Sequence, residues 1–319
     1  MPLPPTQLAI VVPCYDEQEV LPETCAHLTS LLSRLMASGK ITAASRIYFV
    51  DDGSRDTTWE LISGYVRAEK PVVGVKLARN CGHQNALLAG LASAAGDAVI
   101  TVDADLQDDL GAIEVMLDHF HDGCEIVYGV RRRRDTDSPF KRMSAESFYR
   151  VMAWLGVKTI HNHADYRLLS KRAVAGLMDY REVNLYLRGI IPLLGFRSAL
   201  VEYDRIARFA GQSKYPLRKM LALALDAITS FSAFPLRLIS FLGLTVFVGS
   251  MGVTVWALWI ALATDRAIPG WASVVLPMYF LGGIQLLALG AIGEYVGKLY
   301  IEAKSRPRFI VEQILGGPS

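Results

Sequence analysis

The chain has 319 residues, a net charge of only +2 at neutral pH and 52% apolar residues. The balanced charge gives no reason to expect a nucleic-acid partner or a strongly acidic substrate. The apolar content is high for a water-soluble enzyme and indicates that part of the chain lies in a membrane.

The cysteine pattern and the N-terminus both indicate an intracellular first domain. The four cysteines are scattered without Cys-x-x-Cys spacing, which argues against a disulfide framework and against a thiolate metal site. The N-terminal stretch MPLPPTQLAIVV has no basic region, and its apolar run is too short for a signal peptide. We therefore expect the first domain to begin in a reducing, cytosolic environment.

Short apolar or β-branched runs in the first part of the chain predict strands. They span residues 8–12, 46–50, 72–77, 98–102 and 125–128. The segments between the first four are long enough for helices, a rhythm typical of an open, mostly parallel α/β sheet. Polar residues follow the first four runs directly, and ligands of such sheets bind beyond the carboxyl ends of the strands. We expect four strand ends to form one site.

The fourth run ends in ITVDADLQDD, which places four carboxylates within seven residues. Like charges so close raise one another's pKa, so a positive partner is expected there. Asp103 and Asp105, with one residue between them, suit a hard cation such as Mg2+ or Mn2+ that also takes phosphate oxygens. A lone Asp-x-Asp is a weak signal, but its position after a strand strengthens it. Asp108 and Asp109 equally suit the start of the next helix.

Two long stretches near the C-terminus, residues 238–263 and 267–293, contain no charged residue. Each exceeds the roughly 20 residues that cross a bilayer as a helix, so they predict two transmembrane helices. A buried helical hairpin in a soluble core is the alternative. Basic residues flank both outer ends, and the short loop holds only Asp265 and Arg266. The positive-inside rule therefore places both ends of the chain in the cytoplasm and the short loop outside.

Residues 215–234 carry apolar side chains at helical spacing. This pattern predicts an amphipathic helix that lies in the membrane interface or packs on the soluble domain. The expected division is a cytosolic catalytic domain, a juxtamembrane helix, two spans with a short external loop, and a cytosolic tail. These parts correspond to residues 1–210, 211–235, 236–296 and 297–319.

The motifs VVPCYDE, VDDGSRDTT, LARNCGHQNA and VDADLQD occur in the order found in family 2 glycosyltransferases, which the chain resembles. The resemblance implies the GT-A fold. Further stretches, YGVR, HADYRLLS and RFAGQSKY, followed by the paired spans, are similar to the polyprenyl-phosphate monosaccharide transferases, a group that includes bactoprenol glucosyltransferases and dolichyl-phosphate mannose synthases. The similarity covers nearly the whole chain.

The resemblance also implies roles for particular residues. The nucleotide would be bound by Pro13, Tyr15, Glu17, Asp51, Asp52, Asp103 and Ala104. A Mg2+ or Mn2+ ion would be held by Asp103, Asp105 and Gln107. Phosphates of the donor or the lipid would meet Arg131, Arg208 and Lys214. The catalytic residues would be Asp165, Arg131 and Asp105.

The implied reaction is the inverting transfer of a monosaccharide by single displacement. The donor would be UDP-glucose or another UDP-hexose, and the acceptor undecaprenyl phosphate at the cytoplasmic face of a bacterial inner membrane. Because a phosphate dianion needs no general base, Asp165 could orient the sugar or an arginine, or act as the formal base. Gly282, Gly283, Gly290 and Gly293 would let helices approach closely in a homo-oligomer.

Three other readings stay open. One is a GDP-mannose transferase similar to the dolichyl-phosphate mannose synthases, and another is a non-catalytic nucleotide-sugar sensor. A processive polysaccharide synthase is disfavoured because Gln-x-x-Arg-Trp is absent. We interpret Arg131–Arg134 as a solvated or headgroup-facing loop, since nothing else supports nucleic-acid binding. His161 and His163 are expected in a loop or beside the site rather than on a metal.

Overall fold

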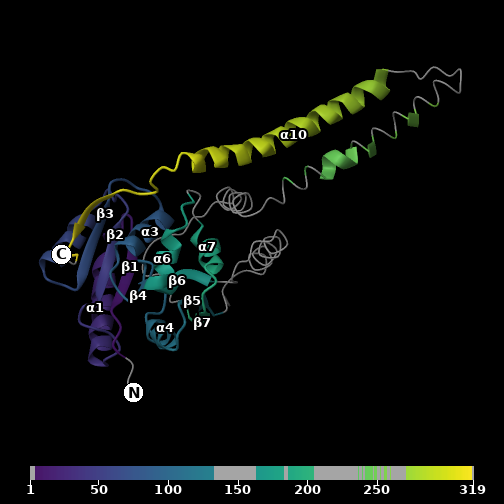
Figure 1. Cartoon of the computed structure of the whole chain (residues 1–319). Helices are drawn as coiled ribbons and strands as arrows, with labels where there is room; N and C mark the ends of the chain where they lie inside the picture. The colour runs from purple at the N-terminus through teal and green to yellow at the C-terminus, as the bar shows by residue number, and fades with distance from the viewer. Residues whose placement is uncertain are drawn as a thin grey trace. The chain divides into compact units, whose positions relative to one another are not determined.

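The computed structural model describes residues 4–132, 163–182, 186–204 and 271–317, with scattered positions between 236 and 259 (Figure 1). The chain divides into two compact units. The first comprises residues 1–153, 158–215 and 305–319, and the second comprises residues 154–157 and 216–304.

The first unit is built on an eight-stranded sheet in the order β7-β5-β6-β4-β1-β2-β3-β8. The strands are β1 (Leu8–Cys14), β2 (Arg46–Asp51), β3 (Val72–Leu77), β4 (Ala98–Thr101), β5 (Ile126–Arg131), β6 (His163–Ser170), β7 (Ser198–Tyr203) and β8 (Val311–Leu315). Neighbours run parallel except that β6 is antiparallel to β4 and β5, and β8 is antiparallel to β3. The predicted α/β, mostly parallel sheet is confirmed.

Helices cover both faces of this sheet. They are α1 (Leu21–Ala37), α2 (Thr58–Arg67), α3 (His83–Ser93), α4 (Ala112–His121), α6 (Lys171–Met178) and α7 (Leu187–Leu193). The main hydrophobic core joins apolar residues of α1, α2 and α4 to alternate residues of β1, such as Ile10 and Val12. Val11 points to the other face, where a Cβ on Gly90 of α3 would lie only 2.3 Å from Val11 Cγ1. Glycine thus lets α3 lie close to the sheet.

The carboxyl ends of β1, β2, β3 and β4 carry the polar loops noted in the sequence. Strands β1 and β4 are buried along their whole length, as expected for central strands covered on both faces. The four parallel strands end at one edge of the sheet, so the loops that follow them form one surface. This edge carries the candidate site.

The C-terminal residues add an edge strand to the first unit. Strand β8 pairs with β3, the amide of Ala78 donates to the Ile310 carbonyl at 2.9 Å, and Lys76 Nζ lies 3.1 Å from Glu312 Oε2. Residues 297–319 were expected to form a tail beyond the membrane part. Within these residues the structure describes the end of a helix, up to Ala303, and then a strand that covers the edge of β3.

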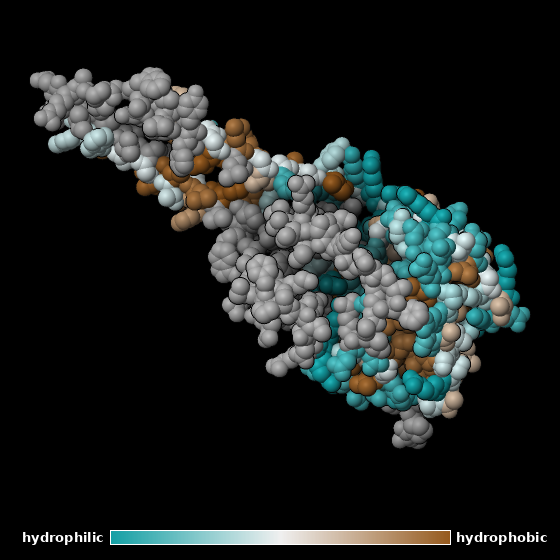
Figure 2. Space-filling model, turned by 180° about the vertical axis from the view of Figure 1, so that it is seen from behind, coloured by the Kyte–Doolittle hydropathy of each residue, from teal (hydrophilic) through white to brown (hydrophobic). Residues whose placement is uncertain are grey.

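The second unit contains α10 (Trp271–Ala303). Within the described part of the chain, one segment, Leu281–Ala303, is long and apolar enough to cross a membrane, and none of it is buried in the structure. Figure 2 shows hydrophobic residues gathered along this helix. The predicted first span, residues 238–263, is described only at scattered positions, so the two-helix hairpin is not confirmed. The predicted amphipathic helix, with Lys214, lies outside the described residues, as does Arg208.

Candidate active site

Two adjacent aspartates at the end of β2 have different surroundings. The Asp52 carboxylate accepts hydrogen bonds from the amides of Cys81 (2.7 Å) and Gly82 (2.9 Å), which ties β2 to the loop before α3. One oxygen of Asp51 accepts the Ser54 amide (3.2 Å), while its other oxygen is buried with no hydrogen-bond partner among the described residues. Burial raises the pKa of both carboxyls. Asp51 therefore has a buried acceptor that no described residue satisfies.

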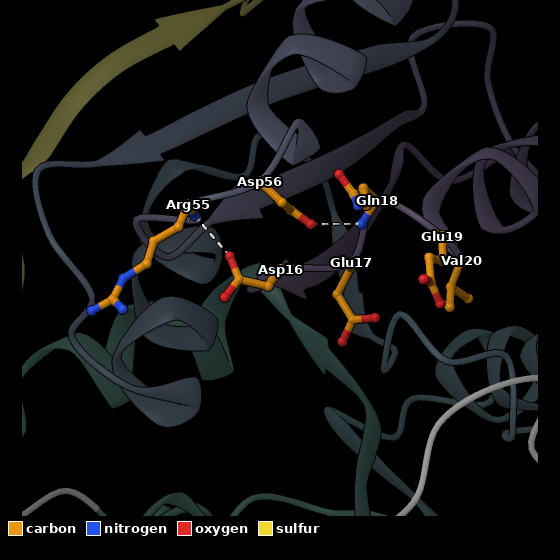
Figure 3. Close-up of a pocket in the computed structure, with 7 residues that line it drawn as sticks. All are labelled: Asp16, Glu17, Gln18, Glu19, Val20, Arg55 and Asp56. Atoms are coloured by element: carbon orange, nitrogen blue, oxygen red, sulfur yellow. Dashed lines mark hydrogen bonds between the residues drawn. The ribbon is translucent and has the colours of Figure 1, made fainter.

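A pocket of about 480 Å³ lies between the loops that follow β1 and β2. Figure 3 shows its lining residues, Asp16, Glu17, Gln18, Glu19, Val20, Arg55 and Asp56. Several hydrogen bonds join the loops, among them those from the Arg55 amide to Asp16 (2.7 Å) and from the Gln18 amide to Asp56 (3.1 Å). Of the predicted nucleotide-binding residues, Glu17 lines this pocket.

Asp103, Ala104 and Asp105 form the loop after β4. Burial raises the pKa of Asp103 to about 6, the carboxylates of Asp108, Asp165 and Asp105 add to the rise, and His83 opposes it. The loop is strained at Leu106, whose φ of 54° lies in the left-handed region. The predicted position of the acidic pair at a parallel strand end is thus found in the structure.

The acidic loop could supply part of the coordination shell of a divalent cation, with the remaining ligands coming from outside the protein. The described residues contain no group of three His, Cys, Asp or Glu side chains placed to hold a metal ion. Asp103 and Asp105 alone suit Mg2+ or Mn2+ when phosphate oxygens and water complete the shell. The pKa of Asp103 is raised first by burial and then by the neighbouring carboxylates, whose negative charge a bound cation would offset. Gln107 is 4% exposed, and its backbone amide donates to Asp105 Oδ1 at 3.3 Å. A ligand role for its side chain stays a prediction.

Asp165 on β6 accepts hydrogen bonds from two arginines. Its carboxylate accepts a hydrogen bond from Arg167, and from Nε (3.2 Å) and Nη2 (2.9 Å) of Arg188. Burial would raise the pKa of Asp165, but the hydrogen bond with His83 and the charges of Arg167 and Arg188 hold it far below its ordinary value. A carboxylate with so low a pKa is a weak base and accepts a proton poorly. This geometry therefore favours the orienting role of Asp165 over the role of formal base.

His83, the first residue of α3, links Asp165 to the acidic loop. Its Nε2 lies 3.7 Å from Asp103 Oδ1 and 3.7 Å from Asp165 Oδ2. Sequence reasoning missed both His83 and Arg188. His83 was visible inside the strand-end motif RNCGH, and Arg188 as the one charge in the run LRGIIPLLGF.

Arg131 lies in a polar cluster at the end of β5. Tyr203 donates its hydroxyl hydrogen to Asp108 Oδ1 (2.5 Å), and Arg131 Nε donates to the Tyr203 hydroxyl (3.2 Å). Arg131 Nη2 lies 3.5 Å from Asp108. The prediction that Asp108 starts the next helix is wrong, because α4 begins at Ala112 and Asp108 is only 3% exposed. Asp108 instead joins the acidic loop to Arg131.

The histidine prediction is partly outside the described residues. His163 forms the first residue of β6 and pairs with Val130 of β5, so its placement in a loop is wrong. His161 and the end of the arginine run, Arg133 and Arg134, lie outside the described part of the chain.

Residues 9–177, just over half of the chain, match the family model described as glycosyl transferase family 2. The chain belongs to this family. It is therefore a glycosyltransferase, as the motifs predicted.

Similarity to curated relatives extends beyond the matched domain. The chain is 50% identical over 307 residues to an uncharacterized glycosyltransferase, YkoT, of Bacillus subtilis, which covers 96% of this chain and 91% of the relative. It is 35% identical to the prophage bactoprenol glucosyl transferase homolog of Escherichia coli, over 97% of this chain and 99% of the relative. It is 36% identical to the bactoprenol glucosyl transferase of Shigella phage SfII, over 96% and 98%.

The solved structures that resemble the chain include glucosyl-3-phosphoglycerate synthase from Mycobacterium tuberculosis. That likeness has a TM-score of 0.42 at 15% sequence identity and covers 70% of this chain and 78% of the other.

Proposed function

We propose that this glycosyltransferase moves a hexose from a UDP-sugar, UDP-glucose first among them, to a polyprenyl phosphate such as undecaprenyl phosphate. The observation that carries the proposal is the extent of the similarity. Relatives named as bactoprenol glucosyl transferases align over 96% to 97% of this chain, which includes the second unit with its apolar helix. A lipid acceptor also accounts for an apolar helix on a sugar transferase, since the acceptor phosphate stays at the membrane surface.

The nucleotide would bind at the ends of β1 and β2. Pro13, Tyr15 and Glu17 line the base and ribose in this proposal. The buried, unpartnered oxygen of Asp51 supports a hydrogen bond from an N–H of the base, because an unpaired buried acceptor is costly. Both oxygens of Asp52 already accept loop amides, so Asp52 would also hold the loop before α3 in position. Asp103 and Ala104 would also contact the nucleotide.

The diphosphate would lie against the loop after β4. Asp103, Asp105 and Gln107 would hold Mg2+ or Mn2+, which supplies positive charge to the leaving diphosphate. Arg131, which contacts Asp108 and Tyr203, would bind a phosphate through its planar guanidinium group. Arg208 and Lys214 are proposed as further phosphate-binding residues.

The acceptor phosphate dianion would attack the anomeric carbon directly. It is nucleophilic near neutral pH, which agrees with an Asp165 that stays ionised and orients arginines. A single displacement inverts the anomeric carbon, giving a β-linked lipid-phosphate sugar from an α-linked donor. The reaction would take place on the cytoplasmic face of a bacterial inner membrane, with two spans anchoring the enzyme.

Nucleotide release from a panel of UDP- and GDP-sugars by the detergent-purified full chain tests this proposal. We expect release from one UDP-hexose only when undecaprenyl phosphate and Mg2+ or Mn2+ are both present. Release from GDP-mannose alone would assign the mannose reading instead. Absence of lipid-dependent release from every donor, with nucleotide still bound, would favour the sensor.

A pair of aspartate variants makes the assay specific to the site. Asp105→Asn should lower lipid-dependent release by at least about a hundredfold, because the loop loses a charge that holds the cation. Asp118→Asn, which alters an exposed aspartate paired with Lys40, should leave release unchanged. Equal rates for both variants would remove the acidic loop from the reaction.

A further inference from the structure

The loop between β4 and α4, which carries the acidic residues, is attached to the rest of the first unit through its backbone. The hydroxyl of Thr24, on α1, donates a hydrogen bond to the Ala104 carbonyl at 2.7 Å. The hydroxyl of Tyr166, on β6, donates to the Asp109 carbonyl at 2.9 Å. Both donors are distant from the loop in the sequence, and their hydrogen bonds attach it on the two sides of Asp105.

Thr24 bonds the loop although its own helix offers a nearer partner in the sequence. A threonine inside a helix commonly donates to the carbonyl four residues back. That carbonyl, of Val20, lies 3.1 Å from the Thr24 hydroxyl and already accepts the Thr24 amide. The Ala104 carbonyl is closer, at the usual O–H···O distance. Both Thr24 and Ala104 are buried, so this hydrogen bond is shielded from water.

Tyr166 attaches the other side of the loop from the same core. Its side chain is 1% exposed and belongs to the main hydrophobic core. The ring of Tyr203 packs edge-on against it, with the ring centroids 5.1 Å apart, and Tyr203 donates its own hydroxyl hydrogen to Asp108. Tyr166 directly follows Asp165, and successive side chains of a strand point to opposite faces. Strand β6 thus supports the loop from one face and carries Asp165 on the other.

The conformation of the loop is one that the chain does not adopt freely. Leu106 has a φ of 54°, in the left-handed region, which is unfavourable for a residue with a Cβ. Four carboxylates between residues 103 and 109 also repel one another. Hydrogen bonds to the backbone on both sides of Asp105 offset these costs and fix where the loop runs.

We propose that Thr24 and Tyr166 are positioning residues for the divalent cation. By fixing the backbone on either side of Asp105, they hold Asp103 and Asp105 in the arrangement that receives the ion. This role rests on the proposed function, which assigns a cation to the loop. Neither hydroxyl touches the ion or the nucleotide. A preorganised pair of carboxylates binds a cation more tightly, because less order has to be imposed when the ion binds.

Binding of Mn2+ to the detergent-purified full chain saturated with UDP, measured by electron paramagnetic resonance of free Mn2+, tests this role without turnover. Thr24→Val keeps the shape of the side chain but loses the hydroxyl, and it should weaken Mn2+ binding by roughly tenfold. Tyr166→Phe should have a similar effect. Thr24→Ser keeps the hydroxyl and should bind Mn2+ nearly as the parent does. UDP affinity without metal should be the same in all three variants.

Two matched variants control for the loss of a hydroxyl elsewhere in the first unit. Thr29→Val acts on the same helix, where the Thr29 hydroxyl donates to the Cys25 carbonyl at 2.7 Å. Tyr48→Phe acts on a tyrosine that is also 1% exposed and whose hydroxyl accepts the Ala95 amide at 3.0 Å, before the start of β4. Both should bind Mn2+ as the parent does, even where they lower the unfolding temperature.

Kinetics separate positioning of the cation from a direct part in the reaction. Thr24→Val should raise the Mn2+ concentration that gives half the maximal rate, while kcat at saturating Mn2+ stays near that of the parent. Unchanged Mn2+ affinity in Thr24→Val or in Tyr166→Phe would overturn the role of that residue. An equal loss in the two control variants, or no recovery in Thr24→Ser, would overturn the proposal. If Tyr166→Phe does not fold, Thr24→Val and Thr24→Ser carry the comparison.

Failure of the proposed function would look different. If the parent bound no more Mn2+ than free UDP does, and Asp105→Asn behaved as the parent, the cation site itself would be contradicted and the positioning role with it. Mn2+ binding by the parent that Asp105→Asn abolishes, together with unchanged binding in Thr24→Val and Tyr166→Phe, would contradict only the positioning role.

Discussion

Asp165 is a carboxylate whose surroundings hold its pKa well below the ordinary value. It lies 14% exposed between Arg167, Arg188 and His83, and these partners outweigh the burial that would otherwise favour its protonated form. A buried pair is costly to break because the remaining charge is left without its partner. At the residue scale, the site therefore depends on charges that hold each other in place.

The lowered pKa of Asp165 predicts a pH-dependent contribution to stability. Because the folded-state pKa lies below the unfolded value of about 3.9, this contribution is complete above that pH and is lost as the pH falls below it. Asp165→Asn should therefore unfold at a lower temperature than the parent at pH 7, and the difference should shrink below about pH 4. Thermal unfolding at both pH values measures this. A difference that grows on acidification would contradict the lowered pKa.

The hydroxyl of Tyr203 predicts a second effect. Tyr203→Phe removes the donor to the buried Asp108 and the acceptor for Arg131, so it should cost about 1–3 kcal/mol of stability. Tyr203→Phe should also raise the KM for the donor, since Arg131 loses the hydrogen bond to the Tyr203 hydroxyl that orients it. Tyr180→Phe, at a half-buried tyrosine elsewhere in the unit, serves as the control for both measurements. Equal stability of the two variants would show that the Asp108 cluster is not needed.

Sequence position predicted the acidic pair but not its partners. Asp103 and Asp105 directly follow an apolar run, and strand ends converge at one edge of a parallel sheet. His83 and Arg188 are 105 positions apart and meet at Asp165 only in the tertiary structure, which no local pattern reveals. The predicted position of Asp108 at the start of a helix was wrong. An acidic residue before a helix has the same local sequence pattern whether it caps the helix or is buried beside an arginine.

At the scale of elements, the central strands could be read from the sequence and the antiparallel ones could not. The runs at residues 8–12, 46–50 and 72–77 are apolar because β1, β2 and β3 are buried on both faces. Strand β6 contains Asp165 and Arg167, and β8 contains charged and exposed residues, so neither has a continuous apolar pattern. The position of β6 between β4 and β5 depends on tertiary pairing alone.

The loops that follow β2 and β3 meet at Gly53. Its φ is 71°, and a Cβ there would lie 2.6 Å from the Asn80 amide nitrogen. Gly53→Ala should cost more than about 1 kcal/mol and weaken UDP binding, because it displaces the loop that Asp52 holds. Gly64→Ala in α2, where a Cβ meets nothing within 4 Å, should instead be neutral or stabilising. Calorimetric unfolding and UDP titration of both variants give the comparison, and parallel behaviour would contradict the close approach.

Strand β8 predicts an effect of removing the C-terminus. Deletion of residues 309–319 exposes the edge of β3 and removes its backbone hydrogen bonds to β8. The first unit should therefore unfold at lower temperature and aggregate more readily. Glu312→Gln removes only an exposed ion pair with Lys76 and should change the unfolding temperature little. Light scattering during thermal unfolding reports both effects. A deletion as stable and soluble as the parent would show that β8 contributes nothing to the sheet.

At the scale of the whole molecule, the chain combines a family 2 glycosyltransferase domain with a long apolar helix whose membrane-length segment is not buried among the described residues. The sequence predicted both parts, because charge-free stretches and strand-end motifs are local properties. The choice of sugar was not predictable, since it depends on loop side chains whose contacts with a donor are set by tertiary structure. The combination nevertheless leads to one central claim, that the sugar ends on a membrane lipid.

The most direct measurement is the fate of labelled glucose from UDP-glucose after incubation with the purified full chain, undecaprenyl phosphate and Mg2+ or Mn2+. The account predicts label in the organic phase as an acid-labile lipid-phosphate sugar, with no transfer when lipid phosphate is omitted. Label that appears only as free glucose in the aqueous phase would contradict transfer to a lipid.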